Sequence, residues 1–249
     1  MSDEVVTTPF GKFLVDPEDC IGGTLKAGTI WDGPGFLQVL GRQYGRFGVE
    51  GISIIDVGAN FGSFTVWAAS QGAWRVIAVE PMPETLRYLK ATLDLNKETC
   101  ADRVVLLPIA GYDRFIEMES RDFSRRNIGG ASVVPAYSLS TENDKEVPVV
   151  PNLTAAPLDA FNYLFGNAVS FIKVDGQGCD GAVLMGLEHT IRRDKPVIVF
   201  EWEERLAGAH GYTLAQIYDW LEGLGYKVNE WPSHPSNHLA LPDFEIDLL

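Results

Sequence analysis

Short apolar runs alternate with helix-compatible stretches through most of this chain. The apolar runs that we expect to form strands are residues 52–57, 74–79, 104–107, 169–175 and 197–200. The stretches between them that predict helices are residues 63–71, 84–96, 158–165 and 179–193. Runs that are apolar at nearly every position are typical of parallel strands buried on both faces, so the alternation predicts an α/β fold.

The pattern continues toward the end of the chain. A helix is expected over residues 213–224, ended by Gly225, and a strand over residues 226–231. A final strand is expected near residues 238–241.

The first fifty residues have a different pattern. Turn signals such as Asp16-Pro17 and Gly22-Gly23 separate short apolar runs, which predicts a small hairpin or two, followed by a helix over residues 36–44. We therefore expect residues 1–50 to form an N-terminal extension that packs on a core domain of residues 51–249.

Residues 113–156 are the least regular part of the chain. A hairpin is expected between two β-rich runs, residues 132–137 and 146–150. Upstream of it, Arg121, Arg125 and Arg126 form a basic cluster. This cluster is either a binding site for an anionic ligand or a solvated face.

Composition indicates one soluble globular domain. The chain has 249 residues, of which 46% are hydrophobic and 22% charged. Its formal net charge of −14 repels polyanions, so nucleic acid is not expected as a partner.

Three cysteines, Cys20, Cys100 and Cys179, are widely separated and lack metal-ligand spacing, which argues against a zinc site and against a disulfide framework. Neither a secretory signal nor a membrane-spanning run is visible, and no membrane partner is expected. A reducing, cytoplasmic location is the expectation that follows.

The stretch from Ile52 to Gly62 joins a strand, a glycine turn and the start of a helix. Gly58 and Gly62 let the backbone turn sharply and approach a bound molecule, while free N–H groups at the helix start face the same place. A side chain at Gly58 is therefore expected to fill the space that this ligand occupies.

Glu80 ends the second expected strand, where an acidic side chain typically holds a ribose diol through two hydrogen bonds. Pro81 and Met82 then offer a rigid apolar corner for an adenine ring. The dinucleotide fingerprint G-x-G-x-x-G would need glycine where Asn60 and Ser63 stand. A nucleoside ligand without phosphates therefore fits better than a dinucleotide.

Three segments in this order resemble the FkbM family of S-adenosylmethionine-dependent methyltransferases. They are residues 56–62 (DVGANFG), residues 79–83 (VEPMP) and residues 171–178 (FIKVDGQG). The resemblance implies a Rossmann-like class I methyltransferase fold, with a seven-stranded, mostly parallel sheet in the order 3-2-1-4-5-7-6 and helices on both faces. It also implies methyl transfer to small molecules or sugars, commonly at oxygen.

The resemblance further implies S-adenosyl-L-methionine as the cofactor. The residues expected to bind it are Asp56, Gly58, Ala59, Asn60, Phe61, Gly62, Glu80, Pro81, Met82, Ala110 and Asp175. The loop of residues 127–132 resembles the family's segment near the active site, and it is equally compatible with a plain connection. Gln177 stands where the family usually has glutamate, so a role for that carboxylate is in doubt.

Methyl transfer depends mainly on positioning, and a base is needed only when the acceptor is a neutral hydroxyl. The candidates for catalysis are Asp175, Glu201, Lys173 and Asp180. Asp175 is preferred because it ends the fourth expected strand. Asp175, Asp180 and Glu201 offer an alternative as ligands of a divalent metal, but their spacing matches no ligand motif, and no metal is expected.

Three classes of function follow from these patterns. The chain is expected to be a methyltransferase that acts on a small-molecule or sugar acceptor. A non-catalytic nucleoside-binding relative and an NAD(P)-dependent oxidoreductase are the alternatives, the latter opposed by the missing middle glycine. The oligomeric state and the acceptor are not specified by the sequence.

Overall fold

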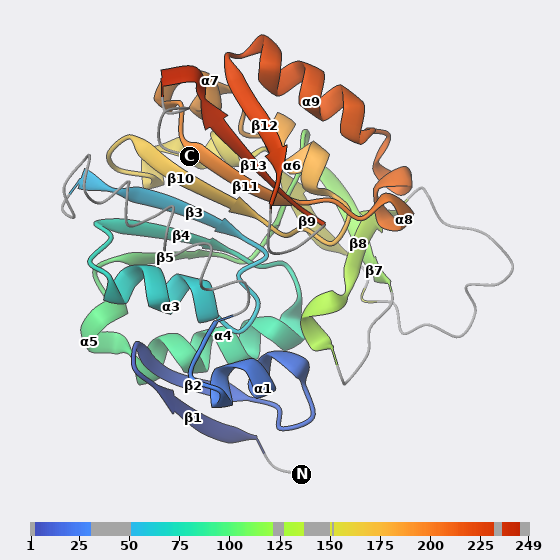
Figure 1. The fold of residues 1–249 in the computed structure, drawn as a ribbon. Helices are drawn as coiled ribbons and strands as arrows, with labels where there is room; N and C mark the ends of the chain where they lie inside the picture. Colours follow the sequence, from blue (N-terminus) through green and yellow to red (C-terminus); the bar gives the residue numbers. More distant parts are fainter. Residues whose placement is uncertain are drawn as a thin grey trace, which may run out of the picture.

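The structure is a computed structural model that describes residues 3–30, 51–121, 127–136, 150, 152–231 and 236–244. Within these residues, a seven-stranded sheet runs through the centre of the molecule (Figure 1). In spatial order its strands are β5 (Val104–Leu107), β4 (Arg75–Val79), β3 (Ser53–Val57), β10 (Val169–Val174), β11 (Val197–Glu201), β13 (Asn237–Pro242) and β12 (Tyr226–Glu230). Strand β13 runs opposite to the other six strands of this sheet. The predicted strand order and the reversed last strand are confirmed.

The central strands are buried on both faces, as their apolar sequences predict. On β3, Ile54 packs into one hydrophobic cluster and the next residue, Ile55, into another, because successive side chains point to opposite faces. Helix α3 (Ser63–Ser70) contributes to the first cluster, together with part of α4 (Pro83–Leu95). The second cluster contains residues of α6 (Asp180–Met185), α7 (Glu188–Asp194) and α9 (Leu214–Gly223). Two short helices, α5 (Lys97–Cys100) and α8 (Glu204–Ala207), also belong to this domain.

A second sheet of four strands lies beside the main one (Figure 1), and sequence analysis did not predict it. Its spatial order is β6 (Ala110–Gly111), β9 (Leu153–Ala156), β7 (Ile116–Arg121) and β8 (Ser132–Pro135). Strand β8, the first run of the expected hairpin between residues 132–137 and 146–150, pairs antiparallel with β7, a partner that sequence analysis did not predict. Residues 146–149 lie outside the described residues. Polar residues Glu117 and Glu119 alternate with less polar ones in β7, which is the pattern of a strand with one buried face, and sequence analysis overlooked it.

The described part of the N-terminal region is a hairpin followed by one helix. Strands β1 (Glu4–Thr8) and β2 (Gly11–Val15) pair antiparallel, and α1 (Cys20–Lys26) begins after the capping residue Asp19. Strand β2 lies along the end of α4, where the Leu14 N–H donates to Thr92 Oγ1 over 3.2 Å. The helix predicted over residues 36–44 lies outside the described residues.

The helix predicted over residues 179–193 is broken into α6 and α7 at Gly186. A β-carbon at Gly186 would lie 1.9 Å from the carbonyl oxygen of Tyr112, so a close backbone approach requires glycine here. Residues Leu158–Leu164 form a 3₁₀ helix (η4), and two shorter 3₁₀ turns lie at Ile128–Gly130 (η2) and Gly208–His210 (η5). Among the helices described, none is both long and apolar enough to cross a lipid bilayer.

Candidate functional site

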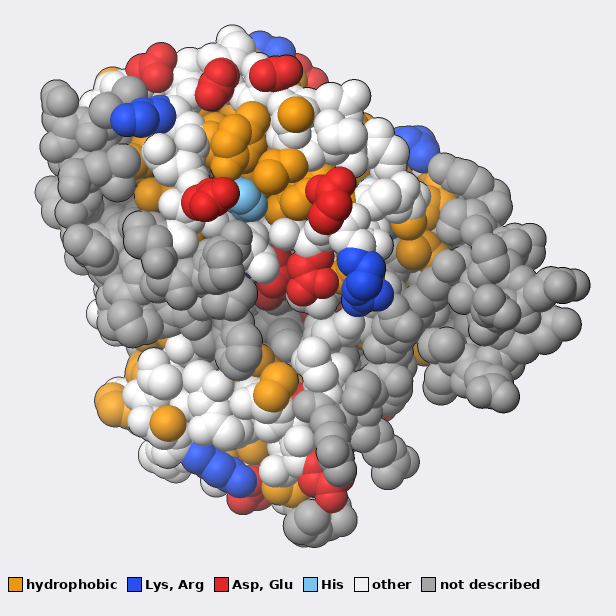
Figure 2. All heavy atoms as spheres, turned by 45° about the vertical axis from the view of Figure 1, so that its right-hand side comes forward, with side chains coloured by type: hydrophobic (Ala, Val, Ile, Leu, Met, Phe, Trp, Pro, Cys, Tyr) orange, Lys and Arg blue, Asp and Glu red, His pale blue; other side chains and the backbone are white. Residues whose placement is uncertain are grey.

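Two adjoining cavities lie at the carboxyl ends of β3, β4 and β10. Strands β3 and β10 are neighbours in the sheet, and the crossovers on either side run in opposite directions, so this is the place where α/β folds bind ligands. The cavities enclose about 440 Å³ and about 950 Å³, counting the space open to solvent. They share four lining residues, namely Gly58, Gly129, Asp175 and Gln177. On the face drawn in Figure 2, acidic side chains gather around a hollow.

The glycine turn after β3 brings this strand end against the end of β10. Gly58 has a φ of +72°, and a β-carbon there would lie 1.9 Å from the carbonyl oxygen of Asp175. The turn is held further by N–H groups of Gly58 and Ala59, which donate to the Val79 carbonyl over 3.0 and 3.1 Å. The expectation that a side chain at Gly58 fills ligand space is therefore corrected, because it would first collide with the backbone of β10.

Glu80 lies at the floor of the smaller cavity, only 5% exposed. Its Oε2 accepts a hydrogen bond from the Asn60 N–H over 2.9 Å. Its Oε1 accepts from the Met82 N–H over 2.9 Å and from the Thr85 hydroxyl over 2.7 Å. Burial raises the pKa of the Glu80 carboxyl, an effect that these donors oppose. The carboxyl thus links the turn after β3 to the start of α4.

The rest of the smaller cavity has mainly apolar walls. Its apolar side chains are Val57, Val79, Pro81, Met82, Ala110, Ala131 and Val133. Ala110 comes from β6 of the second sheet, so that sheet forms one wall of the cavity. A cavity with mainly apolar walls and a carboxyl among its lining residues suits a nucleoside.

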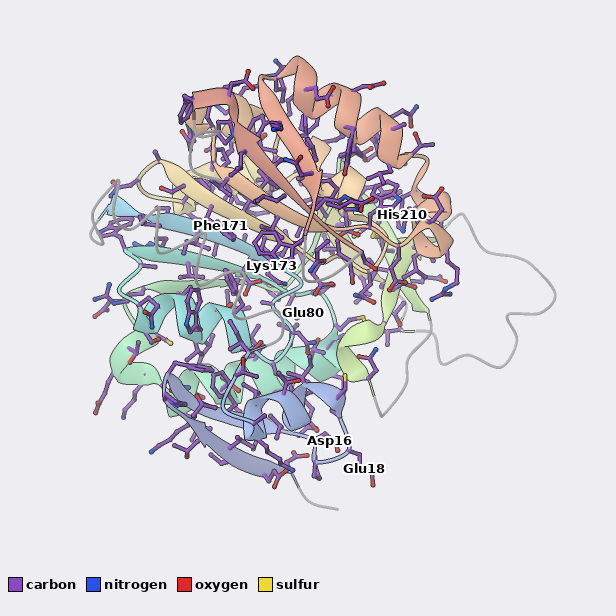
Figure 3. All side chains as sticks on the ribbon, viewed as in Figure 1. Asp16, Glu18, Glu80, Phe171, Lys173 and His210 are labelled. Carbon is purple, nitrogen blue, oxygen red and sulfur yellow. The ribbon has the colours of Figure 1, made fainter. Side chains whose placement is uncertain are left out.

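Lys173 is the positive charge among the described residues of the larger cavity. Its Nζ lies 3.4 Å from Asp56 Oδ1 and 3.6 Å from Asp175 Oδ2. Burial lowers the pKa of this amine, but the charges of Asp56 and Asp175 outweigh it and raise the pKa above its ordinary value. Lys173 therefore stays protonated at neutral pH and does not act as a base. Figure 3 shows Lys173 and Glu80 at the same edge of the sheet.

Gln177 connects two of the candidate catalytic carboxyls. Its Nε2 donates to Asp175 Oδ1 over 2.8 Å and to Glu201 Oε2 over 2.9 Å. Burial, and then the charges of Asp175 and Asp180, raise the pKa of the Glu201 carboxyl to about 10. Glu201 is therefore protonated at neutral pH.

Asp180 lies beneath the loop that follows β10 and lines neither cavity. Its carboxyl oxygens accept from the backbone N–H groups of Gly176, over 2.7 Å, and Gly178, over 3.0 Å. Burial raises the pKa of Asp180 to about 7. These contacts indicate that Asp180 supports the loop and does not meet a substrate.

The expected cofactor-binding residues divide into two groups. Those that line a cavity are Gly58, Ala59, Asn60, Glu80, Pro81, Met82, Ala110 and Asp175. Asp56, Phe61 and Gly62 line neither. Asp56 accepts from the Thr65 hydroxyl over 2.5 Å and faces Lys173, while the buried Phe61 ring packs on Tyr88 with ring centres 4.5 Å apart. These residues shape the turn from behind.

Sequence analysis missed several lining residues. Cys20 and Ile21 of α1 are among them, and both line the larger cavity. Asn127, Gly129 and Gly130 line it too, and they belong to the loop of residues 127–132, which sequence analysis described as either a segment near the active site or a plain connection. A β-carbon at Gly129 would lie 1.8 Å from Asn60 Nδ2, so this loop lies directly on the turn after β3. Glu203, beyond the end of β11, was also missed, because its sequence carries no motif. The side chains of the basic cluster, Arg121, Arg125 and Arg126, lie outside what the structure describes.

Where the structure describes the chain, no group of three or more His, Cys, Asp or Glu side chains is placed to hold a metal ion. His210, on η5, lies away from Glu80 and Lys173 (Figure 3).

Comparison with known families gives one extended match. The sequence model of the methyltransferase FkbM domain matches residues 56–228, which include the glycine turn, Glu80 and the loop after β10. No curated protein matches the chain.

Solved structures similar to this chain include the methyltransferase FkbM from Methylobacillus flagellatus. It is 17% identical, with a TM-score of 0.51, and the match covers 77% of this chain and 43% of that one. This chain therefore spans less than half the length of that protein. At such identity the likeness shows a shared fold.

Two other structures are more distant. Precorrin-6y C5,15-methyltransferase from Geobacter metallireducens is 14% identical, with a TM-score of 0.39, over 82% of this chain and 88% of that one. Fibrillarin from Aeropyrum pernix, solved with natively bound S-adenosyl-L-methionine, is 9% identical, with a TM-score of 0.42, over 76% of this chain and 65% of that one.

Proposed function

The chain belongs to the FkbM family of methyltransferases, and on that premise we propose that it transfers a methyl group from S-adenosylmethionine to a hydroxyl group of a small molecule or sugar. The observation that carries this proposal is the pair of cavities that meet at Gly58 and Asp175. The smaller one suits a nucleoside, and the larger, polar one has room for an amino-acid tail and an acceptor.

Glu80 would hold the ribose. Of the described residues, two donors contact its Oε1 and one contacts its Oε2, which leaves Oε2 with a free acceptor position. One ribose hydroxyl, rather than the two expected from sequence, would therefore bond to this carboxylate. Pro81, Met82 and Ala110 would flank the adenine.

The residues at the junction fit a cationic cofactor. When bound, S-adenosylmethionine supplies a methyl group on a sulfonium, which departs as a neutral thioether. Asp175 lines both cavities, and its side chain is 32% exposed, so its carboxylate is available to a cation bound at the junction. Lys173, already engaged with Asp56 and Asp175, keeps the local charge from becoming strongly negative.

Asp175 would also act on the acceptor. As the acceptor oxygen forms its bond to the methyl carbon, its hydroxyl proton passes to the Asp175 carboxylate. General-base assistance of this kind contributes typically about 10²- to 10⁴-fold. Glu201 is protonated and Lys173 is a cation, so neither takes this role in the resting site.

The larger cavity suits an acceptor with several hydroxyl groups. Its polar side chains include Asn60, Ser63, Asn127, Gln177 and Glu203. Amide side chains can both donate hydrogen bonds to hydroxyls and accept from them, and a carboxylate accepts from them.

The experiment is a parallel binding and transfer assay. Thermal unfolding is measured with saturating S-adenosylhomocysteine, NAD and NADP, and the expected result is stabilisation by S-adenosylhomocysteine alone. Small hydroxylated metabolites and sugars are then screened for uptake of labelled methyl. Stabilisation by a dinucleotide instead would favour an oxidoreductase, and binding without transfer to any acceptor would favour a non-catalytic relative.

A further inference from the structure

The Gln177 side chain occupies an unusual position in this site. It lines both cavities, and its backbone has a φ of +50°, a conformation that side-chain-bearing residues seldom adopt. This backbone directs the side chain back across the ends of β10 and β11. Its amide nitrogen then lies between Asp175 and Glu201.

Only a group with two N–H donors can make both contacts. An amide nitrogen carries two hydrogens, and each is directed at a different carboxyl oxygen here. If the amide oxygen or a carboxylate oxygen stood where Nε2 is, its lone pairs would face the lone pairs of the Asp175 and Glu201 oxygens. Gln177 therefore differs from glutamate at this position in chemistry and not in shape.

The charge around this contact explains why a donor is needed. Asp56, Asp175, Asp180 and Glu201 gather around the end of β10, with Glu203 beyond, and Lys173 is the cation that the described residues place among them. Asp175 contacts the Lys173 ammonium through Oδ2 and the Gln177 amide through Oδ1. Glu201 keeps its proton, which also lets it donate to Asp175.

On the basis of the proposed function, we propose that Gln177 is a positioning residue whose amide ties Asp175 and Glu201 into one acid–base pair at the junction of the two cavities. Asp175 receives the acceptor's proton, while Glu201, whose raised pKa favours its protonated form, donates a hydrogen bond to Asp175. Gln177 itself touches neither the methyl group nor the acceptor oxygen in the reaction.

The test compares Gln177→Glu and Gln177→Met with the parent protein. Gln177→Glu keeps the shape and replaces a donor by an acid, while Gln177→Met removes the hydrogen bonds without adding charge. Gln71→Glu is the matched control, because Gln71 is exposed at the end of α3 and undergoes the same chemical change away from the site.

Thermal unfolding without ligand is measured first, from pH 5.5 to pH 9. A carboxyl at position 177 beside Asp175 has a raised pKa in the folded state, because its ionised form would be repelled by the neighbouring carboxylate. The folded protein therefore loses stability as pH rises through that pKa. The melting temperature of Gln177→Glu is expected to fall progressively below that of the parent with rising pH, and that of Gln71→Glu to run parallel to it. Parallel curves for both variants would overturn the proposal, since they would show that the side chain at position 177 does not lie against the carboxyls of Asp175 and Glu201.

Kinetics supply the second measurement. Gln177→Met is expected to lower kcat by roughly 10²-fold, the loss typical of a misplaced catalytic group, with dissociation constants for S-adenosylhomocysteine within about threefold of the parent. An unchanged kcat, or a loss confined to cofactor affinity, would overturn the positioning role. If the parent protein binds no S-adenosylhomocysteine, the proposed function fails instead, and the unfolding curves still decide whether the amide joins the two carboxyls.

Discussion

The carbonyl oxygen of Asp175 lies 1.9 Å from the point where a β-carbon on residue Gly58 would be. Strands β3 and β10 pair along their length although they are more than a hundred residues apart in sequence, and this contact brings the residues that follow each strand together. The contact places Asp175 at the junction of both cavities.

Gly58→Ala should therefore damage the site by moving the end of β10. We expect a loss of stability of about 1 to 3 kcal/mol, the cost of a strained backbone position, together with loss of S-adenosylhomocysteine binding. Denaturant unfolding and calorimetry measure the two effects. Gly223→Ala is the control: it lies in α9 with nothing within 4 Å of its β-carbon position, so it should be neutral or slightly stabilising. An equally stable Gly58→Ala that still binds would contradict this view of the turn.

Glu80→Ala should weaken S-adenosylhomocysteine binding by about 1.5 to 3 kcal/mol, the range for hydrogen bonds to a charged group. Because three buried donors lose their acceptor, the variant should also be less stable than the parent. Titration calorimetry gives the affinity, and Glu84→Ala, at an exposed position of α4, is the control. Undiminished affinity would reduce Glu80 to a structural link between the turn and α4.

Asp175→Asn tests the proposed base while keeping the side-chain shape. Cofactor affinity should stay near normal, while turnover should fall at least about 10²-fold. A variant that loses affinity in step with rate would show that Asp175 anchors the cofactor's amino group. If neither quantity changes, Asp175 is only the polar end of β10.

The buried His210 is expected to make the folded protein less stable in acid. Burial lowers its pKa to about 4, below the usual value of 6.5, and its Nδ1 lies 3.4 Å from the Tyr112 hydroxyl. Because the folded state resists protonation, its stability contribution is present above pH 6.5 and is lost as pH falls toward 4. The loss for this group amounts to up to about 3 kcal/mol.

Unfolding of His210→Gln, followed from pH 7 to pH 4, should show a flatter acid limb than the parent protein. His189→Gln, at an exposed position, should leave the acid limb unchanged. Identical acid limbs in all three proteins would remove His210 as a cause of acid lability.

The sequence predicted the parts of the molecule that depend on local pattern. Strands β3, β4 and β10 are mainly apolar runs, and the turn with Gly58 and Gly62 follows β3 directly, so the sequence was enough to predict the turn and its position at the end of a central strand. The strand order came from family resemblance, and the structure has it.

Other features depend on contacts between distant residues. Strand β7 has the alternating pattern of a half-buried strand, but its pairing with β8 and β9, which come later in the chain, has no local signal. At the break, Gly186 lies in close contact with the backbone carbonyl of Tyr112, and this contact cannot be predicted from the helix sequence. Gln177 was noted only as a departure from the family's glutamate, because its two carboxyl partners meet only in the folded sheet.

The central claim is that the two cavities together hold one S-adenosylmethionine, and a crystal structure of the protein with S-adenosylhomocysteine tests it most directly. The prediction places the ribose at Glu80 Oε2, the adenine against Met82 and Ala110, and the thioether sulfur at the junction beside Gly58 and Asp175. Density for the ligand anywhere else, or crystals that stay empty at saturating ligand, would contradict it.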